Sequence, residues 1–154
     1  GAREAGFPAE KIFLGDKAIR YCTGCSVCSL YGKPCPQKDD MSEILDKMLA
    51  ADVIVMATPV YFYTMSAQMK TLIDRCCGLY TQMQNKEFYF IVTAEDDQKK
   101  IERTIDTFQG FLDCLDGATI KGVVYGLGVW HAGEIKGNPA MQEAYDLGHK
   151  VGEA

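Results

Sequence analysis

Residues 52–63 read DVIVMATPVYFY and contain the strongest fold signal in the chain. The part through Ala57 is an apolar run rich in β-branched residues, which is typical of a strand covered on both faces in a parallel sheet. Thr58 and Pro59 then interrupt this pattern. We therefore predict a parallel α/β sheet in which the strand at 52–57 ends in an aromatic segment.

Strands and helices alternate on both sides of this run. We predict further strands at 11–15, 87–93 and 119–128, and helices at 40–50, 66–80, 98–115 and 139–151. Asp40 and Glu43 form a capping-box pattern, and Ser66 is an N-cap candidate. This alternation indicates βαβ units with right-handed crossovers, in one three-layer α/β domain over residues 1–154.

Composition excludes several classes of protein. Hydrophobic residues make up 47% of the 154 residues and charged residues 24%, which is ordinary globular usage. The formal net charge of -5 opposes binding to nucleic acid or to anionic lipid. The apolar runs are shorter than the roughly 20 residues that cross a bilayer, and no secretory signal pattern is present. We expect a cytoplasmic protein with small-molecule or protein partners.

In open parallel sheets, ligands bind beyond the carboxyl ends of the strands. This rule selects three predicted loops, at 16–38, 58–66 and 94–98. The second loop contains the aromatic residues Tyr61, Phe62 and Tyr63 next to main-chain donors and acceptors. Such a loop could hold a flat heteroaromatic ring, and it could equally pack in a dimer interface or in the core.

Four of the seven cysteines lie close together, in the segment CTGCSVCSLYGKPCP at residues 22–36. The spacing Cys-x2-Cys-x2-Cys-x6-Cys-Pro is similar to an iron-sulfur ligand run, although bacterial ferredoxins have three residues in the last gap. A zinc site and four free thiols are the alternatives. The spacing is less typical of zinc, because four-cysteine zinc sites usually separate two Cys-x2-Cys pairs more widely. The candidate ligands are Cys22, Cys25, Cys28 and Cys35.

Other polar residues give weaker signals. Lys70 and Asp74 can pair at i,i+4, and Arg75 can reach a neighbouring element or subunit, which we interpret as surface ion pairing. His131, beside Trp130, could act on a substrate or be a solvated loop residue. No nucleophile and base pattern and no phosphate-binding glycine motif is evident.

Two segments together resemble a known family. They are IRYCTGCSVCSLYGKPCPQKDDM at 19–41 and AADVIVMATPVYFYTMSAQMKTLIDR at 50–75. Both are similar to the NADPH-dependent FMN reductases of the flavodoxin-like fold, and the cysteine segment resembles the iron-sulfur flavoproteins within that group. The resemblance extends over essentially the whole chain, to AYDLGHKVGEA at 144–154.

The resemblance implies a five-stranded parallel sheet in the order 2-1-3-4-5, with FMN at the carboxyl edge. It implies that NAD(P)H reduces the flavin, which passes electrons to a flavin, quinone or other small acceptor, or serves an iron-sulfur electron carrier. It also implies a homodimer or homotetramer in which a neighbour's loops complete the flavin site. The residues that would border the flavin are Thr58, Pro59, Val60, Tyr61, Phe62, Thr93, Ala94 and Glu95. Cys22, Cys25, Cys28 and Cys35 would hold a [4Fe-4S] cluster.

Two features depart from the family pattern. Residues 1–6 read as the last turn of a helix, and nothing before the strand at 11–15 matches the family's first strand and its phosphate-binding loop. We expect that this strand, loop and helix are absent from the chain; a fragment that binds no flavin is therefore a further alternative. The acidic segment at 94–97 would repel a dinucleotide phosphate, which leaves the choice between NADH and NADPH open.

Overall fold

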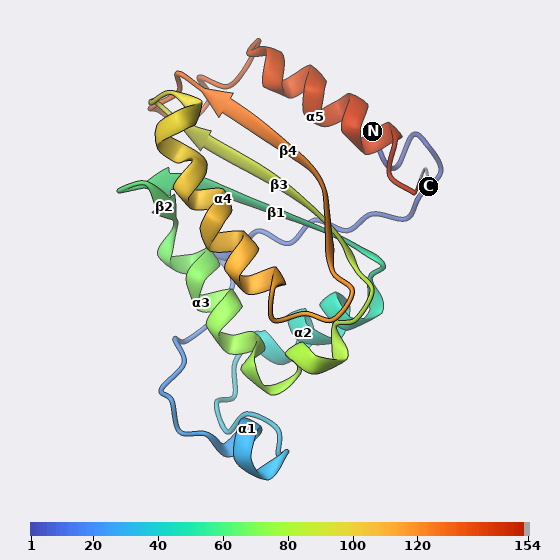
Figure 1. The fold of residues 1–154 in the computed structure, drawn as a ribbon, viewed down its shortest axis with the longest axis vertical. Coiled ribbons are helices and arrows are strands. Elements are labelled where there is room, and N and C mark those ends of the chain that lie inside the picture. Colours follow the sequence, from blue (N-terminus) through green and yellow to red (C-terminus); the bar gives the residue numbers. More distant parts are fainter. Residues whose placement is uncertain (153–154) are drawn as a thin grey trace.

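The computed structural model describes residues 1–152. Their sheet has four strands in the order β2-β1-β3-β4 (Figure 1). β1 (Val53–Tyr61), β3 (Glu87–Ala94) and β4 (Thr119–Leu127) are parallel, and the two-residue β2 (Thr64–Met65) is antiparallel to β1. The predicted domain also includes residues 153–154, which lie outside the described part of the chain.

Helices cover both faces of the sheet. α2 (Met41–Ala50), α3 (Ala67–Arg75) and α4 (Gln98–Leu112) contribute to one core against β1 and β3. α5 (Pro139–His149) packs on the opposite face, where Leu147 lies against Gly122 of β4. The three-layer α/β class predicted from the sequence is therefore confirmed.

Aromatic residues form the centre of the core. Phe88 and Phe90 project from β3, and the Phe90 ring stacks on Phe108 of α4 with 4.4 Å between ring centroids. Phe111 meets Phe88 edge to face at 6.3 Å. Offset stacking and edge-to-face contact are the preferred arrangements of aromatic pairs, so this core fixes α4 on the sheet.

Three short 3-10 turns and one short helix connect these elements. The turns are η1 (Leu14–Asp16), η2 (Cys76–Gly78) and η3 (Tyr80–Gln82), and the short helix is α1 (Val27–Tyr31). α3 therefore ends before the Tyr80 predicted from the sequence. No helix in the described part of the chain has the length and apolar character needed to cross a membrane.

The strand predicted at 11–15 is wrong. Residues 11–13 pair with no strand, and η1 occupies the end of the segment. Ile12 and Leu14 still pack against the core, whereas the side chain of Phe13 is exposed. A strand also needs a neighbour for its main chain, and this segment has none among the described residues. The family order 2-1-3-4-5 is not confirmed by these residues.

β1 is also less covered than predicted. Ile54, Met56 and Thr58 are buried, whereas Val55 on the other face is 53% exposed. β1 pairs with β3 over 53–59, and on its other side it pairs with β2 only at Val60 and Tyr61. The prediction that both faces of this strand are covered is thus wrong, because α5 lies over β4. Within residues 1–152 the outer edge of β1 has no strand beside it over 53–59.

The starts of the helices follow local chemistry. Ser66 accepts a hydrogen bond from the Met69 amide, which confirms the predicted cap of α3. Asp40 does not cap α2; its carboxylate accepts from the Ala18 amide at 2.7 Å. The neighbouring Asp39 accepts from the Met41 amide at 3.2 Å instead. The capping box predicted at Asp40 and Glu43 therefore does not form, although the helix does.

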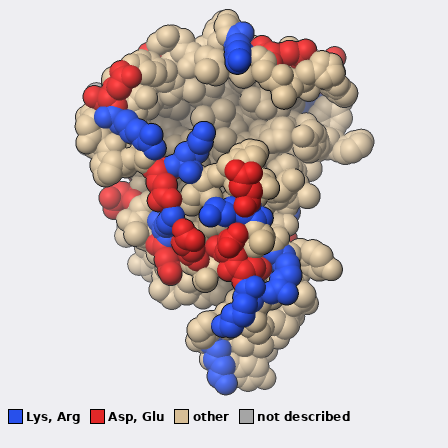
Figure 2. Space-filling model, turned by 180° about the vertical axis from the view of Figure 1, so that it is seen from behind, with Lys and Arg blue, Asp and Glu red and all other residues tan. Residues whose placement is uncertain are grey.

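Charged side chains are mixed on the side of the molecule opposite to the view of Figure 1. Figure 2 shows acidic and basic groups interspersed over the middle of this side, below a hollow that is mostly free of charge. Lys47 pairs with both Glu10 at 2.5 Å and Glu43 at 2.8 Å, which ties the first residues to α2. These exposed ion pairs contribute little stability individually.

Candidate functional site

The carboxyl ends of β1 and β3 bring the two predicted flavin-binding segments together. Pro59 lies opposite Thr93 in the ladder, and Thr93 lies opposite Gly126 of β4. Because parallel strands end at the same edge, Thr58 to Phe62 and Thr93 to Glu95 lie side by side there. The loops predicted at 58–66 and 94–98 are thus both at the carboxyl edge.

The aromatic segment forms a hairpin, not an open loop. β1 ends at Tyr61. The turn consists of Phe62 and Tyr63, after which the chain returns as β2. Both turn residues have positive φ, +51° at Phe62 and +62° at Tyr63. The Phe62 ring is fully exposed, and Tyr61 is also exposed. The hairpin therefore presents aromatic rings at the edge of the sheet without using them in the core.

Thr58 fixes the base of this hairpin. Its buried hydroxyl accepts a hydrogen bond from the Ser66 amide at 3.0 Å and donates to the Pro59 carbonyl at 2.8 Å. Ser66 in turn caps α3. The Thr58 side chain is therefore occupied within the protein, so that only its main chain is available to a ligand.

The loop after β3 is acidic and well anchored. The Ala94 carbonyl accepts a hydrogen bond from the Val129 amide at 3.1 Å, which joins this loop to the end of β4. Asp97 caps α4 by accepting from the Lys100 amide. Asp96 pairs with the Lys100 ammonium at 2.7 Å, and this hydrogen bond lowers the pKa of Asp96. Glu95 is exposed beyond the strand.

Two further contacts connect the hairpin and the neighbouring loops. The Tyr63 hydroxyl donates to the Asp96 carboxylate at 3.3 Å. After β4, Glu134 accepts hydrogen bonds from the amides of Trp130 and His131, both at 2.8 Å, while the Trp130 side chain is 73% exposed. Trp130 was not selected from the sequence as a binding residue, yet it follows the strand end that adjoins Ala94.

The loop predicted at 16–38, which contains the four clustered cysteines and is called the cysteine loop below, does not lie at the carboxyl edge of the sheet. Figure 1 places α1 and its loop at the C-terminal end of α3, whereas the carboxyl ends of the strands lie near the N-terminal end of α3. The prediction that residues 16–38 form a third loop at the carboxyl edge is therefore wrong, because the strand expected at 11–15 does not form. Nine residues of helix separate the two regions.

The four candidate ligands are accessible thiols. Cys22 and Cys25 are exposed, and Cys28 and Cys35 are half-buried. Among residues 1–152 no three Cys, His, Asp or Glu side chains are gathered into a metal-binding group. Four thiols on one loop nevertheless match in kind and number the donor set of a [4Fe-4S] cluster. These residues would have to converge to hold one.

Two more cysteines adjoin this loop. Cys76 is buried, and burial raises the pKa of its thiol to about 12, so it stays protonated and packs in the core. Cys77 is exposed and lies beside Cys28. A methyl group at Gly78 would lie 2.9 Å from the Cβ atom of Cys28, so α1 rests directly on η2.

Arg75 and Asp39 form a buried ion pair under the cysteine loop. The Nη1 atom of Arg75 lies 2.7 Å from Oδ2 of Asp39, and the two side chains are only 3% and 4% exposed. Arg75 reaches a neighbouring element, as expected from the sequence, but the expected surface position of its ion pair is wrong. Lys70 and Asp74 do pair on the surface. The available signal was spacing, since Arg75 follows the buried Met69 and Leu72 at intervals of three residues.

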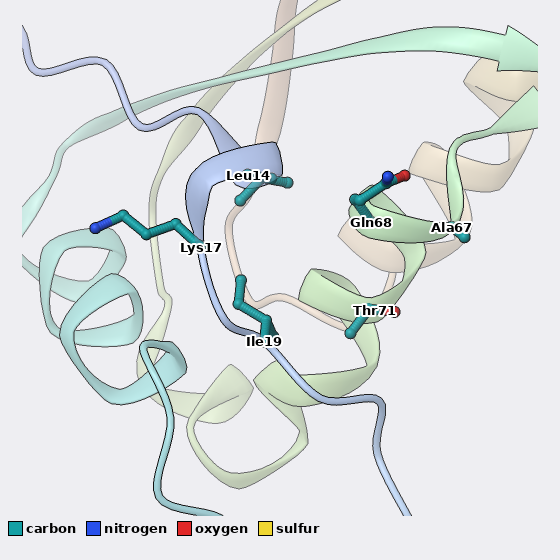
Figure 3. Close-up of a pocket in the computed structure, with 6 residues that line it drawn as sticks. All are labelled: Leu14, Lys17, Ile19, Ala67, Gln68 and Thr71. Atoms are coloured by element: carbon teal, nitrogen blue, oxygen red, sulfur yellow. The ribbon is translucent and has the colours of Figure 1, made fainter.

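A groove lies between η1 and α3. It encloses about 250 Å³ between Leu14, Lys17 and Ile19 on one side and Ala67, Gln68 and Thr71 on the other (Figure 3). Figure 3 shows the Lys17 ammonium directed away from α3. The lining offers no pair of acid and base groups, so this groove does not resemble a catalytic site.

These features define a class of protein, the flavodoxin-like α/β domain with a candidate ligand site at the carboxyl edge of a parallel sheet. The solved structure of RosB with a bound flavin-phosphate intermediate superposes with a TM-score of 0.73 at 16% identity, over 97% of this chain and 64% of that one. The Trp repressor binding protein of Bacillus subtilis gives a TM-score of 0.61 at 28% identity, over 70% of this chain and 75% of that one.

Sequence comparison identifies the family. Residues 1–132 match the family described as NADPH-dependent FMN reductase, so this chain belongs to it. An iron-sulfur flavoprotein of Archaeoglobus fulgidus is 34% identical over 97% of this chain and 67% of its own length. An iron-sulfur flavoprotein of Methanocaldococcus jannaschii is 40% identical over 70% of this chain and 56% of its own. The resemblance noted from the sequence is confirmed.

A third relative has a different name. The putative NAD(P)H-dependent FMN-containing oxidoreductase YwqN of Bacillus subtilis is 29% identical over 92% of this chain and 82% of its own length. The chain thus covers 67% and 56% of the lengths of the two iron-sulfur flavoproteins described above, and 82% of this third relative.

Proposed function

We propose that the protein is an FMN-dependent oxidoreductase that takes electrons from NAD(P)H and passes them to a flavin, a quinone or another small acceptor. The observation that carries this proposal is the meeting of 58–62 and 93–95 at the ends of neighbouring strands, where Pro59 lies opposite Thr93. Membership of the FMN reductase family and the name of the relative YwqN support it.

The residues at this edge fit a flat flavin ring. Tyr61 and Phe62 are exposed and offer apolar surface, and the peptide groups at the strand ends offer donors and acceptors for the polar rim of the ring. When bound, FMN supplies the hydride and electron chemistry. The chain's own residues would orient the ring and leave one face open to the nicotinamide.

The N-termini of three helices are candidate contacts for the FMN phosphate, because helix N-termini commonly bind anions. The N-caps of α3, α4 and α5 are Ser66, Asp97 and Asn138, and the side chain of each accepts a hydrogen bond from its own helix. The carboxylate of Asp97 would also repel a phosphate. We therefore propose that the carboxyl edge of the sheet contacts the flavin ring, and we assign no contact with the FMN phosphate to the N-termini of these three helices.

A titration of the full-length protein with FMN tests the ring site. We expect Phe62→Ala to weaken FMN binding roughly tenfold, because an aromatic contact with a buried ring contributes about 1 to 2 kcal/mol. Phe13→Ala is the matched control, since Phe13 is an exposed aromatic residue on the η1 segment. Equal affinity of the wild type and Phe62→Ala would contradict the assignment. Parallel assays with NADH and NADPH show which donor is used.

A second candidate function is that of an iron-sulfur flavoprotein, with a [4Fe-4S] cluster held by Cys22, Cys25, Cys28 and Cys35. The chemistry of the four-thiol loop and the names of two relatives favour it. The cluster would supply one-electron transfer. Because α3 separates this loop from the carboxyl edge, electron transfer to a flavin in a neighbouring subunit of a homodimer or homotetramer is the arrangement we propose.

Spectroscopy and metal analysis of anaerobically purified full-length protein distinguish the two functions. Flavin absorption at about 375 and 450 nm without iron favours the reductase alone. A shoulder near about 400 nm with about four irons per chain supports the cluster. Cys25→Ser should then lose the iron, whereas Cys114→Ser, which changes an exposed thiol at the end of α4, should keep it. Light scattering of the same sample reports the number of subunits.

A further inference from the structure

The cysteine loop is closed at its base by one buried arginine. Arg75 donates from Nη1 to the Arg20 carbonyl at 2.6 Å and to Oδ2 of Asp39 at 2.7 Å. Nη2 donates to Oδ1 of Asp39 at 3.0 Å. The guanidinium therefore binds the residue that precedes the loop and the residue that follows it, in the two-pronged geometry that arginine forms with a carboxylate.

Asp39 completes this closure from the other side. Its Oδ2 atom accepts from the Arg20 amide at 3.1 Å, and its Oδ1 atom accepts from the Met41 amide at 3.2 Å. Arg20 is thus held at both its N–H and its C=O, 19 positions from Asp39 in the sequence. All four candidate ligands lie between these two residues.

Arg75 also reaches one of the thiols. Its Nη2 atom lies 3.6 Å from Sγ of Cys35, within hydrogen-bonding range for sulfur. An arginine is always cationic, and its side chain here is buried, so its interaction with a negative sulfur is weakly screened. Hydrogen bonds to ligand sulfurs raise the reduction potential of iron-sulfur clusters because they stabilise the more negative, reduced state.

We propose that Arg75 is a positioning residue for the cysteine loop: it closes the loop through Arg20 and Asp39, and it holds Cys35 by a hydrogen bond that raises the reduction potential of a cluster bound there. The second part rests on the iron-sulfur candidate function proposed above. The first part does not, because the closure exists among this chain's own groups.

Hydrogen exchange on the iron-free, full-length protein tests the closure. Arg75→Lys keeps the positive charge but loses the two-pronged geometry. We expect the Arg20 and Met41 amides, both bound to Asp39, to exchange about tenfold faster or more in this variant, since a hydrogen bond to a charged group is lost. Lys70→Gln is the matched control on the same helix, and its effect on these amides should stay within about twofold.

Because Arg75→Lys changes a buried side chain, this variant could fail to fold. A second, smaller substitution therefore provides an independent test. Cys35→Ala leaves the Asp39–Arg75 pair intact and removes only the sulfur acceptor. We expect it to speed exchange at the Arg20 amide by about threefold, as the loss of one weak hydrogen bond predicts. Unchanged exchange at both amides in a folded Arg75→Lys protein overturns the closure, and unchanged exchange in Cys35→Ala overturns the hydrogen bond between Arg75 and Cys35.

The reduction potential tests the second part. In iron-loaded full-length protein, a potentiometric titration followed by electron paramagnetic resonance should give a more negative midpoint for Arg75→Lys than for the wild type or Lys70→Gln. An equal or more positive midpoint with full iron content overturns the role at Cys35. Absence of iron from the wild type refutes the cluster itself, and the exchange data remain a separate test of the closure.

Discussion

The tip of the β1–β2 hairpin should be strained, and relieving this strain should stabilise the protein. Phe62 and Tyr63 occupy the two central positions of the turn with φ of +51° and +62°. Two-residue hairpin turns with positive φ at both positions strongly favour Asn-Gly, because other side chains crowd the main chain in this conformation. Here the turn contains two large aromatic residues. Phe62→Asn is the substitution that relieves the strain with least disturbance.

The expected magnitude follows from the exposure of Phe62. The left-handed conformation costs about 1 to 2 kcal/mol for a residue with a Cβ atom, and asparagine tolerates it better than most. Because the Phe62 ring is fully exposed, its removal costs little packing within this chain. We therefore expect Phe62→Asn to raise the free energy of unfolding by about 1 kcal/mol, or the melting temperature by about 2 to 4 °C.

Urea unfolding of flavin-free protein measures this change, and Phe62→Ala separates its cause. Alanine removes the ring but keeps a Cβ atom at positive φ, so its unfolding free energy should stay within about 0.5 kcal/mol of the wild type. Both variants should lose FMN affinity to a similar extent if the ring contacts the flavin. Stability then distinguishes the two variants while flavin binding does not.

Two results would refute this reasoning. Destabilisation by Phe62→Asn would mean that the Phe62 ring has a packing role. Equal stabilisation by alanine and asparagine would mean that the ring, not the main chain, is the source of the strain. The expected result would mean that Phe62, an exposed aromatic residue beside the candidate flavin site, lowers the free energy of unfolding of the protein.

Three further predictions concern groups that hold the scaffold together. The hydrogen bond from Arg75 lowers the pKa of Asp39 to about 2, so its ionised form favours the folded state; about 2 kcal/mol of stability should be present above about pH 4 and be lost as the pH falls towards 2. Urea unfolding across this range should show a smaller pH slope in Asp39→Asn, and an equal slope would contradict the assignment. Lys86→Met should destabilise the fold by about 1 to 3 kcal/mol, because the ammonium of this buried lysine holds the end of α2. It donates to the carbonyls of Leu49 at 2.8 Å and Ala51 at 2.5 Å. An unchanged midpoint in thermal unfolding would show that water replaces the ammonium at these carbonyls. Ser66→Ala should cost about 1 kcal/mol through loss of the α3 cap, whereas Ser66→Asp, which can also cap, should retain most of the stability in the same assay.

The sequence predicted the elements that carry their own signal. The strands predicted at 52–57 and 87–93 and the helix predicted at 98–115 are present as β1, β3 and α4, because the periodicity of apolar residues is a local property of the sequence. The segment at 11–15 was also predicted as a strand, yet it pairs with no strand. Whether such a segment becomes a strand depends on a neighbour for its main chain, which its own residues do not encode.

The candidate site was predictable in part for the same reason. The position of 58–62 beside 93–95 follows from the parallel strand order. The hairpin was missed because its turn lacks glycine and asparagine, the usual signals. The Asp39–Arg75 pair was missed because it joins residues 36 positions apart, and only folding brings these charges together. Spacing on α3 indicated a buried face, but the residue type suggested a surface position.

The open edge of β1 bears on how this chain behaves in solution. Among residues 1–152, no strand pairs with the outer edge of β1 over 53–59, which is an apolar, uncharged segment that includes the exposed Val55. Such an edge is a template for strands of other molecules, and segments of six or seven residues with this composition are prone to cross-β assembly. Pro59 and the short β2 protect only its last residues. Aggregation of the isolated 154-residue chain should therefore begin at this strand, and a charge at Val55 would be the first change to suppress it.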